Sequence, residues 1–184
     1  MNIVTWLRKR PGAAEWDGPL SGIPIFEGLS RRERRWVAQM MRPRTCPPGT
    51  PIFHEGERDE RLYVVLEGRV QILRAVSEIP PACLGPGEFF GETALIAEFP
   101  RSASAVPLDP VHLLSLSRSD FVRLCDRHPH IGVQIAIHLS QVIAERLRQT
   151  NHLLKEAQAH RPQTDEAEVP EESEILRHRP GGQA

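Results

Sequence analysis

The residues best suited to chemistry lie in one segment, residues 84–95, which reads LGPGEFFGETAL. Glycine has no Cβ, so Gly91 lets the backbone turn tightly and approach a ligand closely. The residues that follow are good helix formers, and a short helix is expected to begin at Glu92 and to end before Pro100. The first N–H groups of such a helix, near Thr93 and Ala94, have no acceptor within it. The segment therefore predicts a site for an anion.

Two charged side chains narrow the chemistry of that anion. Arg101 follows Pro100, which stiffens the chain, and its guanidinium can make a two-pronged contact with a phosphate. Glu92 would repel a phosphate in direct contact, so its carboxylate suits hydrogen bonds from sugar hydroxyls nearby. Ser102 and Ala103 are small and leave room beside the arginine. Together these residues predict a site for a sugar phosphate of low charge.

The elements that must position this site are mostly short strands. Between residues 47 and 117, short apolar runs alternate with glycine and proline turns. Residues 62–66, 70–73 and 111–116 are typical of strands, and Gly68 is expected to form a hairpin turn between the first two. This pattern predicts a β-sandwich or barrel of the jelly-roll kind with the short helix embedded in it.

Helices are expected on both sides of the strands. Ser30 and Glu33 have the spacing of a capping box, which predicts a helix that ends near Pro43. Ser117 and Asp120 begin a short helix, and a long helix is expected over residues 130–159. Its apolar residues fall into two stripes, one close to a coiled-coil seam (Leu139, Ile143, Leu147, Thr150, Leu154 and Ala157) and one that starts with Ile135, Leu139 and Val142. The helix either covers both its own domain and a partner helix, or packs one broad stripe on its own core.

The site resembles the phosphate-binding cassette of cyclic nucleotide-binding domains, the family of the catabolite activator protein and of the regulatory subunits of cyclic-AMP-dependent kinase. The shared pattern is Phe90-Gly91-Glu92-x-Ala94-Leu95 followed by Pro100-Arg101-x-Ala103, with Gly49, Gly56 and Gly68 upstream. The resemblance spans about residues 23–158. It implies a mainly β fold, an eight-stranded jelly-roll-like β-roll with flanking helices and a long C-terminal helix.

The resemblance also implies which residues bind a ligand. The cassette contacts would be Gly91, Glu92, Thr93, Ala94, Arg101, Ser102 and Ala103, with Glu92 at the ribose 2′-hydroxyl. Residues 145–151 resemble the part of the long helix that touches the base in the bacterial activators, which makes Thr150 and Asn151 the expected base contacts. The ligand would be cyclic AMP or cyclic GMP, with cyclic AMP favoured, and no cofactor or metal is expected.

A stand-alone sensor is the function that these features predict. The activators carry a helix-turn-helix domain after the long helix, whereas residues 160–184 here are acidic and contain proline and glycine. We therefore expect no nucleic-acid partner. The sensor would signal to a protein effector by helix rearrangement and could form a homodimer through the long helix. No arrangement of nucleophile and base suggests catalysis.

Two other functions fit parts of the sequence. A ligand-free interaction scaffold would keep the fold and pair Arg101 with Glu92 in a vacated pocket. A nucleic-acid-associated protein would use the cluster of Arg31, Arg32, Arg34 and Arg35. The formal net charge of −1 argues against the second function, because no overall basic field is present.

The remaining sequence features place the protein in a broad class. Its 184 residues suffice for one domain (residues 23–159) with a flexible N-terminal arm (residues 1–22) and a disordered acidic tail (residues 160–184). Cys46, Cys83 and Cys125 are scattered, which suits a reducing compartment, and no apolar run is long enough to cross a bilayer. His128 and His130 lack a third metal ligand nearby. The expected location is the cytoplasm.

Overall fold

The computed structural model describes residues 17–75 and 80–159. The predicted acidic tail, residues 160–184, and most of the predicted arm lie outside the described residues. The last part of the arm is described: helix α2 (Asp17–Leu20) places Leu20 in the core with no exposed surface. The folded part therefore begins before residue 23, earlier than the sequence predicted.

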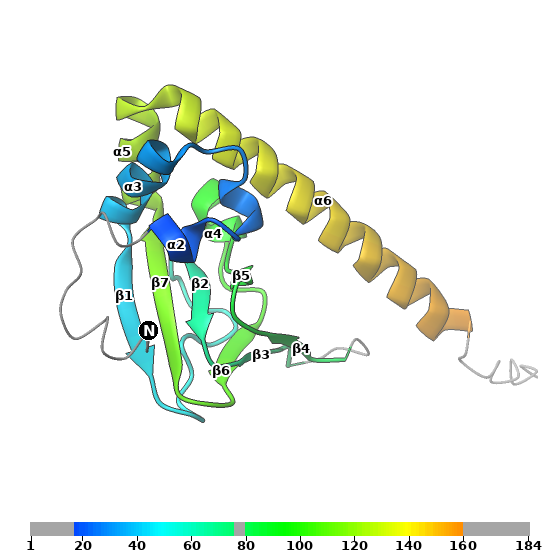
Figure 1. Cartoon of the computed structure of the whole chain (residues 1–184). Coiled ribbons are helices and arrows are strands. Elements are labelled where there is room, and N and C mark those ends of the chain that lie inside the picture. The colour runs from blue at the N-terminus through cyan, green and yellow to red at the C-terminus, as the bar shows by residue number, and fades with distance from the viewer. Residues whose placement is uncertain (1–16, 76–79, 160–184) are drawn as a thin grey trace, which may run out of the picture.

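Antiparallel strands in two sheets form the body of the domain (Figure 1). The first sheet has the order β1 (Arg42–Cys46), β7 (Val111–Ser117), β2 (Arg61–Glu67) and β5 (Phe89–Phe90). The second has the order β4 (Ala82–Leu84), β3 (Val70–Leu73) and β6 (Ser104–Pro107). The predicted β-roll with flanking helices is confirmed.

The described residues hold seven strands rather than the eight that the family resemblance implied. The segment before Gly56 comes closest to an eighth, because Phe53 forms an isolated antiparallel bridge with Ala105. Pro51 precedes this bridge and cannot donate to a ladder, and the chain turns at Gly56 with a φ of +83°. Pairing is therefore limited to one bridge.

Gly68 joins the two sheets and does not close a hairpin, so the predicted hairpin is wrong. Strand β2 pairs with β5 and β7, whereas β3 pairs with β4 and β6. At Gly68 φ is +81°, and a Cβ there would lie 2.5 Å from the carbonyl oxygen of Pro110. The glycine thus permits a tight corner against the chain that leads into β7.

Strand β2 divides the core into two clusters through its alternating side chains. Leu62, Val64 and Leu66 pack with the helices, whereas Tyr63 and Val65 face the space between the sheets. The helical cluster includes Phe26, Val37, Leu124, Ile135 and Leu139, and the cluster inside the roll includes Phe53, Phe90, Ala105 and Leu113. Both faces of the central strand are buried, so its register is strongly specified.

Within the described ranges, five helical elements follow α2 and flank or interrupt the strands. They are η2 (Pro24–Phe26), α3 (Arg31–Met40), α4 (Thr93–Ile96), α5 (Arg118–Arg127) and α6 (Pro129–Ala159). The predicted capping box is present, since Ser30 accepts from the Glu33 backbone and Glu33 accepts from the Ser30 backbone. Ser117 also caps α5, because its hydroxyl oxygen accepts from the Asp120 backbone N–H. No helix in the described ranges is long and apolar enough to span a membrane.

Helix α6 leaves the β-roll partway along its length (Figure 1). Its first half packs on the domain through Ile131, Ile135 and Leu139, which are all at most 1% exposed. Val142 packs against the same cluster. The predicted stripe of Ile135, Leu139 and Val142 therefore covers the protein's own core.

Candidate anion-binding site

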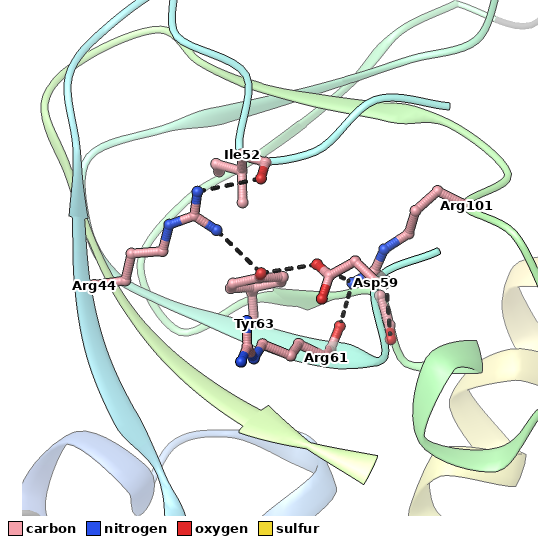
Figure 2. A network of polar contacts seen from close by, with 7 residues as sticks. Arg44, Ile52, Asp59, Arg61, Tyr63 and Arg101 are labelled. Atoms are coloured by element: carbon pink, nitrogen blue, oxygen red, sulfur yellow. Dashed lines mark hydrogen bonds and ion pairs between the residues drawn. The ribbon is translucent and has the colours of Figure 1, made fainter. Parts of the chain in front are cut away.

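The side chain of Arg101 is the centre of the site and is only 4% exposed. Its Nη2 donates to Asp59 Oδ2 at 2.8 Å and to the carbonyl oxygen of Arg61 at 2.6 Å (Figure 2). Its guanidinium carbon lies 4.0 Å from the centre of the Phe53 ring, within the range of a cation–π contact. The ion pair with Asp59 therefore holds a charged group inside the roll.

The other nitrogens of Arg101 retain hydrogen-bonding capacity. Nη1 makes only a long contact, 3.5 Å from the carbonyl oxygen of Gly91. The buried Nε has no acceptor among the described residues. Buried polar groups are nearly always satisfied, and an unsatisfied one calls for an explanation such as a missing ligand. The buried guanidinium can thus bind an anion through Nε and Nη1 while it keeps its ion pair with Asp59.

Gly91 lies directly against this guanidinium. Its φ is +75°, and a Cβ built on it would lie 2.4 Å from Arg101 Nη1 and 2.7 Å from the carbonyl oxygen of Arg61. Only glycine combines this backbone conformation with this approach. Helix α4 begins two residues later, with Glu92 at its N-cap, so the short helix of the cassette is present as predicted. The Ala94 N–H, however, donates to the carbonyl oxygen of Gly91 at 3.2 Å and is not open to an anion as the sequence predicted.

A network of polar groups extends from Asp59 away from the cassette (Figure 2). Tyr63 donates its hydroxyl proton to Asp59 Oδ2 at 2.8 Å, and Arg44 Nη1 donates to the Tyr63 oxygen at 3.1 Å. Arg44 Nη2 also donates to the carbonyl oxygen of Ile52 at 3.2 Å. Burial raises the pKa of Tyr63, and the hydrogen bond to Asp59 raises it further, so the phenol stays protonated at neutral pH.

Glu92 is engaged by the long helix. Its Oε1 lies 2.9 Å from Nη1 of Arg146 on α6, and Arg146 Nη2 donates to the carbonyl oxygen of Phe89 at 2.9 Å. The guanidinium carbon of Arg146 also lies 5.1 Å from the Phe89 ring centre. Arg101 and Glu92 therefore each have a different partner, unlike the mutual pair expected of a vacated pocket. One arginine thus ties α6 to the cassette.

The other predicted ligand contacts differ in how they are placed. Of the other cassette residues, Thr93 and Ser102 are exposed. Ala94 and Ala103 are buried and pack within the domain. Thr150 is half-buried and Asn151 is exposed, more than one turn beyond Arg146 along α6. Their role as base contacts stays a prediction.

The two histidines on either side of Pro129, where α5 ends and α6 begins, are engaged in other contacts. The His128 ring stacks on Trp36 at 4.1 Å, and His130 Nε2 lies 3.8 Å from Glu33 Oε1. Among the described residues, no group of three or more His, Cys, Asp or Glu side chains could hold a metal ion.

Sequence reasoning missed the groups that hold Arg101 and Glu92. Asp59 lies 42 residues before Arg101, in an acidic turn that carries no local signal for an ion pair. The strand pattern includes Tyr63 but indicates no role for its hydroxyl, and no motif in the sequence points to Arg44. Arg146 lies within the predicted base-contact segment, but only the folded chain brings it to Glu92.

The fold is a β-roll with a candidate anion site, and comparison with known proteins gives its family. Residues 43–128 match the family model of the cyclic nucleotide-binding domain. A solved N-terminal domain of a transcriptional regulator from Streptomyces coelicolor is 33% identical, with a TM-score of 0.57, and the match covers 71% of this chain and 90% of that one. The chain belongs to the cyclic nucleotide-binding domain family.

Two further relatives show how far the similarity extends. The cyclic AMP receptor protein of Thermus thermophilus is 38% identical over 135 residues, which are 72% of this chain and 61% of that protein. A solved cyclic nucleotide-binding domain from Methylobacillus flagellatus is 26% identical with a TM-score of 0.69, and the match covers 79% and 86% of the two chains. The chain therefore spans less than two thirds of the length of the Thermus receptor.

Proposed function

We propose that the protein is a regulatory sensor that binds a cyclic nucleotide monophosphate, with cyclic AMP preferred over cyclic GMP. The buried Arg101 guanidinium carries the proposal, because its Nε lacks an acceptor in the described part of the chain and its Nη1 has only a long one. A cyclic phosphate supplies one negative charge and the oxygen acceptors that these groups need. The name of the Thermus relative supports the choice of cyclic AMP.

Calorimetric titration of the wild-type protein with cyclic AMP and cyclic GMP tests this proposal. We expect binding of both, tighter for cyclic AMP, and at least tenfold weaker binding by Arg101→Gln, since a charge-assisted hydrogen bond contributes about 1.5–3 kcal/mol. Arg69→Gln is the matched control, because Arg69 is exposed and pairs with Asp109, and neither residue belongs to the cassette. Equal affinity of Arg101→Gln and wild type would refute the proposal.

Thermal unfolding separates the sensor from a ligand-free scaffold. A ligand that binds only the folded state stabilises it in proportion to the logarithm of its concentration. The melting temperature should therefore rise with cyclic AMP in the wild type and rise much less in Arg101→Gln. No shift at millimolar nucleotide would favour the scaffold.

The proposed signal is a repositioning of α6. Glu92 is the expected ribose partner, and in this structure Arg146 of α6 holds its carboxylate. A ribose hydroxyl that donates to Glu92 competes with Arg146 for this carboxylate. The ion pair that attaches α6 to the cassette therefore changes when the nucleotide binds. Nucleotide binding then shifts the population of α6 positions, which a protein effector detects.

We propose that α6 also joins two copies of the chain. Val133, Ile137, Leu147 and Leu154 are 38–60% exposed and follow a heptad spacing along one face of the helix. This face differs from the predicted seam, because Leu139 is buried in its own domain. A homodimer would cover these side chains.

The proposed sensor acts in the cytoplasm, without a catalytic step and without binding nucleic acid. The thiols of Cys46, Cys83 and Cys125 are all free, which fits a reducing compartment. Arg101, the buried charge at the site, is held by Asp59 on one side and lies against aromatic rings, an arrangement suited to binding an anion.

A further inference from the structure

The network behind Arg101 poses a problem of charge. An arginine that binds an anion must be held still, and Asp59 does this by accepting from Nη2. The same carboxylate also cancels the positive charge that attracts the anion, since charges this close interact strongly away from water. An ion pair alone would thus hold Arg101 in place and at the same time weaken its attraction for an anion.

Tyr63 and Arg44 offset the negative charge of Asp59. The Tyr63 hydroxyl donates to Oδ2 of Asp59, the same oxygen that accepts from Arg101, and so shares the carboxylate's charge. Arg44 donates to the Tyr63 oxygen from the far side, which aligns the hydroxyl proton with Asp59. The two arginines and one aspartate sum to 2 − 1 = +1 across the network (Figure 2). The positive charge is preserved while Arg101 stays fixed.

The Tyr63 ring contacts the other end of the cassette. It stacks on Phe90 with ring centres 5.3 Å apart and planes 18° apart, and Phe90 directly precedes Gly91. Phe53 lies 5.9 Å from the Tyr63 ring centre and 5.8 Å from that of Phe90. One side chain therefore supports Gly91 through its ring and Arg101 through its hydroxyl.

We infer that Tyr63 and Arg44 are positioning residues of the anion site, which hold Asp59 so that Arg101 keeps a fixed orientation and a net positive surrounding. The inference rests on the proposed binding of a cyclic nucleotide. Neither residue touches the ligand. Both act through Asp59, which extends the site from the cassette to strand β1.

Tyr63→Phe tests the role of the hydroxyl, because it keeps the ring and its stacking. We expect cyclic AMP to bind about three- to tenfold more weakly, as for the loss of one buried hydrogen bond. Ser115→Ala is the matched control: Ser115 lies opposite Tyr63 in the sheet and is buried, but its hydroxyl donates to the carbonyl oxygen of Arg42. Equal affinities of the two variants, with both folded by circular dichroism, would overturn the inference.

Arg44→Gln and Arg42→Gln form a second matched pair on strand β1. Arg44 reaches the Tyr63 hydroxyl, whereas the Arg42 side chain is exposed at the start of the same strand. Loss of the Arg44 charge should weaken cyclic AMP binding more than loss of the Arg42 charge, and the gap should narrow as salt screens the site. Equal weakening would contradict the role of Arg44.

A double-mutant cycle separates positioning from general loss of stability. If Tyr63 acts through Arg101, Tyr63→Phe should leave cyclic AMP affinity unchanged in an Arg101→Gln background. Full additivity of the two substitutions would overturn the inference while leaving the proposed function intact. No binding of cyclic AMP or cyclic GMP by the wild type would overturn both.

Discussion

Gly91 combines two constraints that no other residue type satisfies together. Its φ of +75° lies in the left-handed region, and its Cα is so close to Arg101 that a Cβ would lie 2.4 Å from Nη1. The first constraint costs a residue with a side chain about 1–2 kcal/mol. The close approach would also disturb the site, because a Cβ would push against Arg101, which Asp59 holds in place.

Gly91→Ala should therefore lose both stability and ligand binding. We expect a loss of more than about 2 kcal/mol in the free energy of unfolding by urea, and at least tenfold weaker cyclic AMP binding by calorimetry. Gly87→Ala is the matched control, because Gly87 has a φ of +90° but open space around the position of a Cβ. Similar effects of both substitutions on binding would mean that only backbone strain matters.

At the level of elements, local signals in the sequence predicted helices and strands well. Both helix caps depend on residues three apart, Ser30 with Glu33 and Ser117 with Asp120, so they are visible in the sequence. Gly68 shows where local signals end. The chain does turn there, with a φ of +81°, but a turn residue does not reveal whether the next strand joins the same sheet.

For the candidate site, too, the residues close together in sequence were predictable and their distant partners were not. Gly91, Glu92 and Arg101 lie within eleven residues and share a recognisable pattern. The groups that hold them come from elsewhere in the chain: Asp59 lies just before β2, and Arg146 lies on α6. Such partners depend on the packing of elements, so no spacing in the sequence indicates them.

The contact between α6 and the cassette depends on Arg146, and its loss should loosen the helix. In Arg146→Gln the ion pair with Glu92 is removed, so amide hydrogen exchange should quicken in α6 around and beyond residue 146. Arg148→Gln is the matched control, because Arg148 is exposed and pairs with Glu145 on the same helix. Equal exchange in both variants would show that Arg146 does not hold α6.

At the level of the whole molecule, the second half of α6 keeps large apolar side chains exposed within the described chain. Leu147 is 60% exposed and Leu154 is 38% exposed, on the face that also carries Val133 and Ile137. Ser140 and Ala144 lie between them in the heptad spacing and are small, which lets a second helix approach closely. Such a face suits an identical helix, because in a two-fold dimer each copy buries the same residues.

Leu147→Gln tests this arrangement by placing an amide at the centre of the exposed face. Burial of a leucine contributes about 1.5–3 kcal/mol, and a symmetric dimer loses two such contributions, so sedimentation equilibrium should show dimerisation weakened at least tenfold. Val122→Gln is the matched control, because Val122 is 49% exposed but lies on α5. A wild-type protein that stays monomeric at high concentration, or a Leu147→Gln variant that dimerises as well as wild type, would rule out this face. If the dimer forms through α6, repositioning of the helix by Arg146 and Glu92 in one copy acts directly on the other.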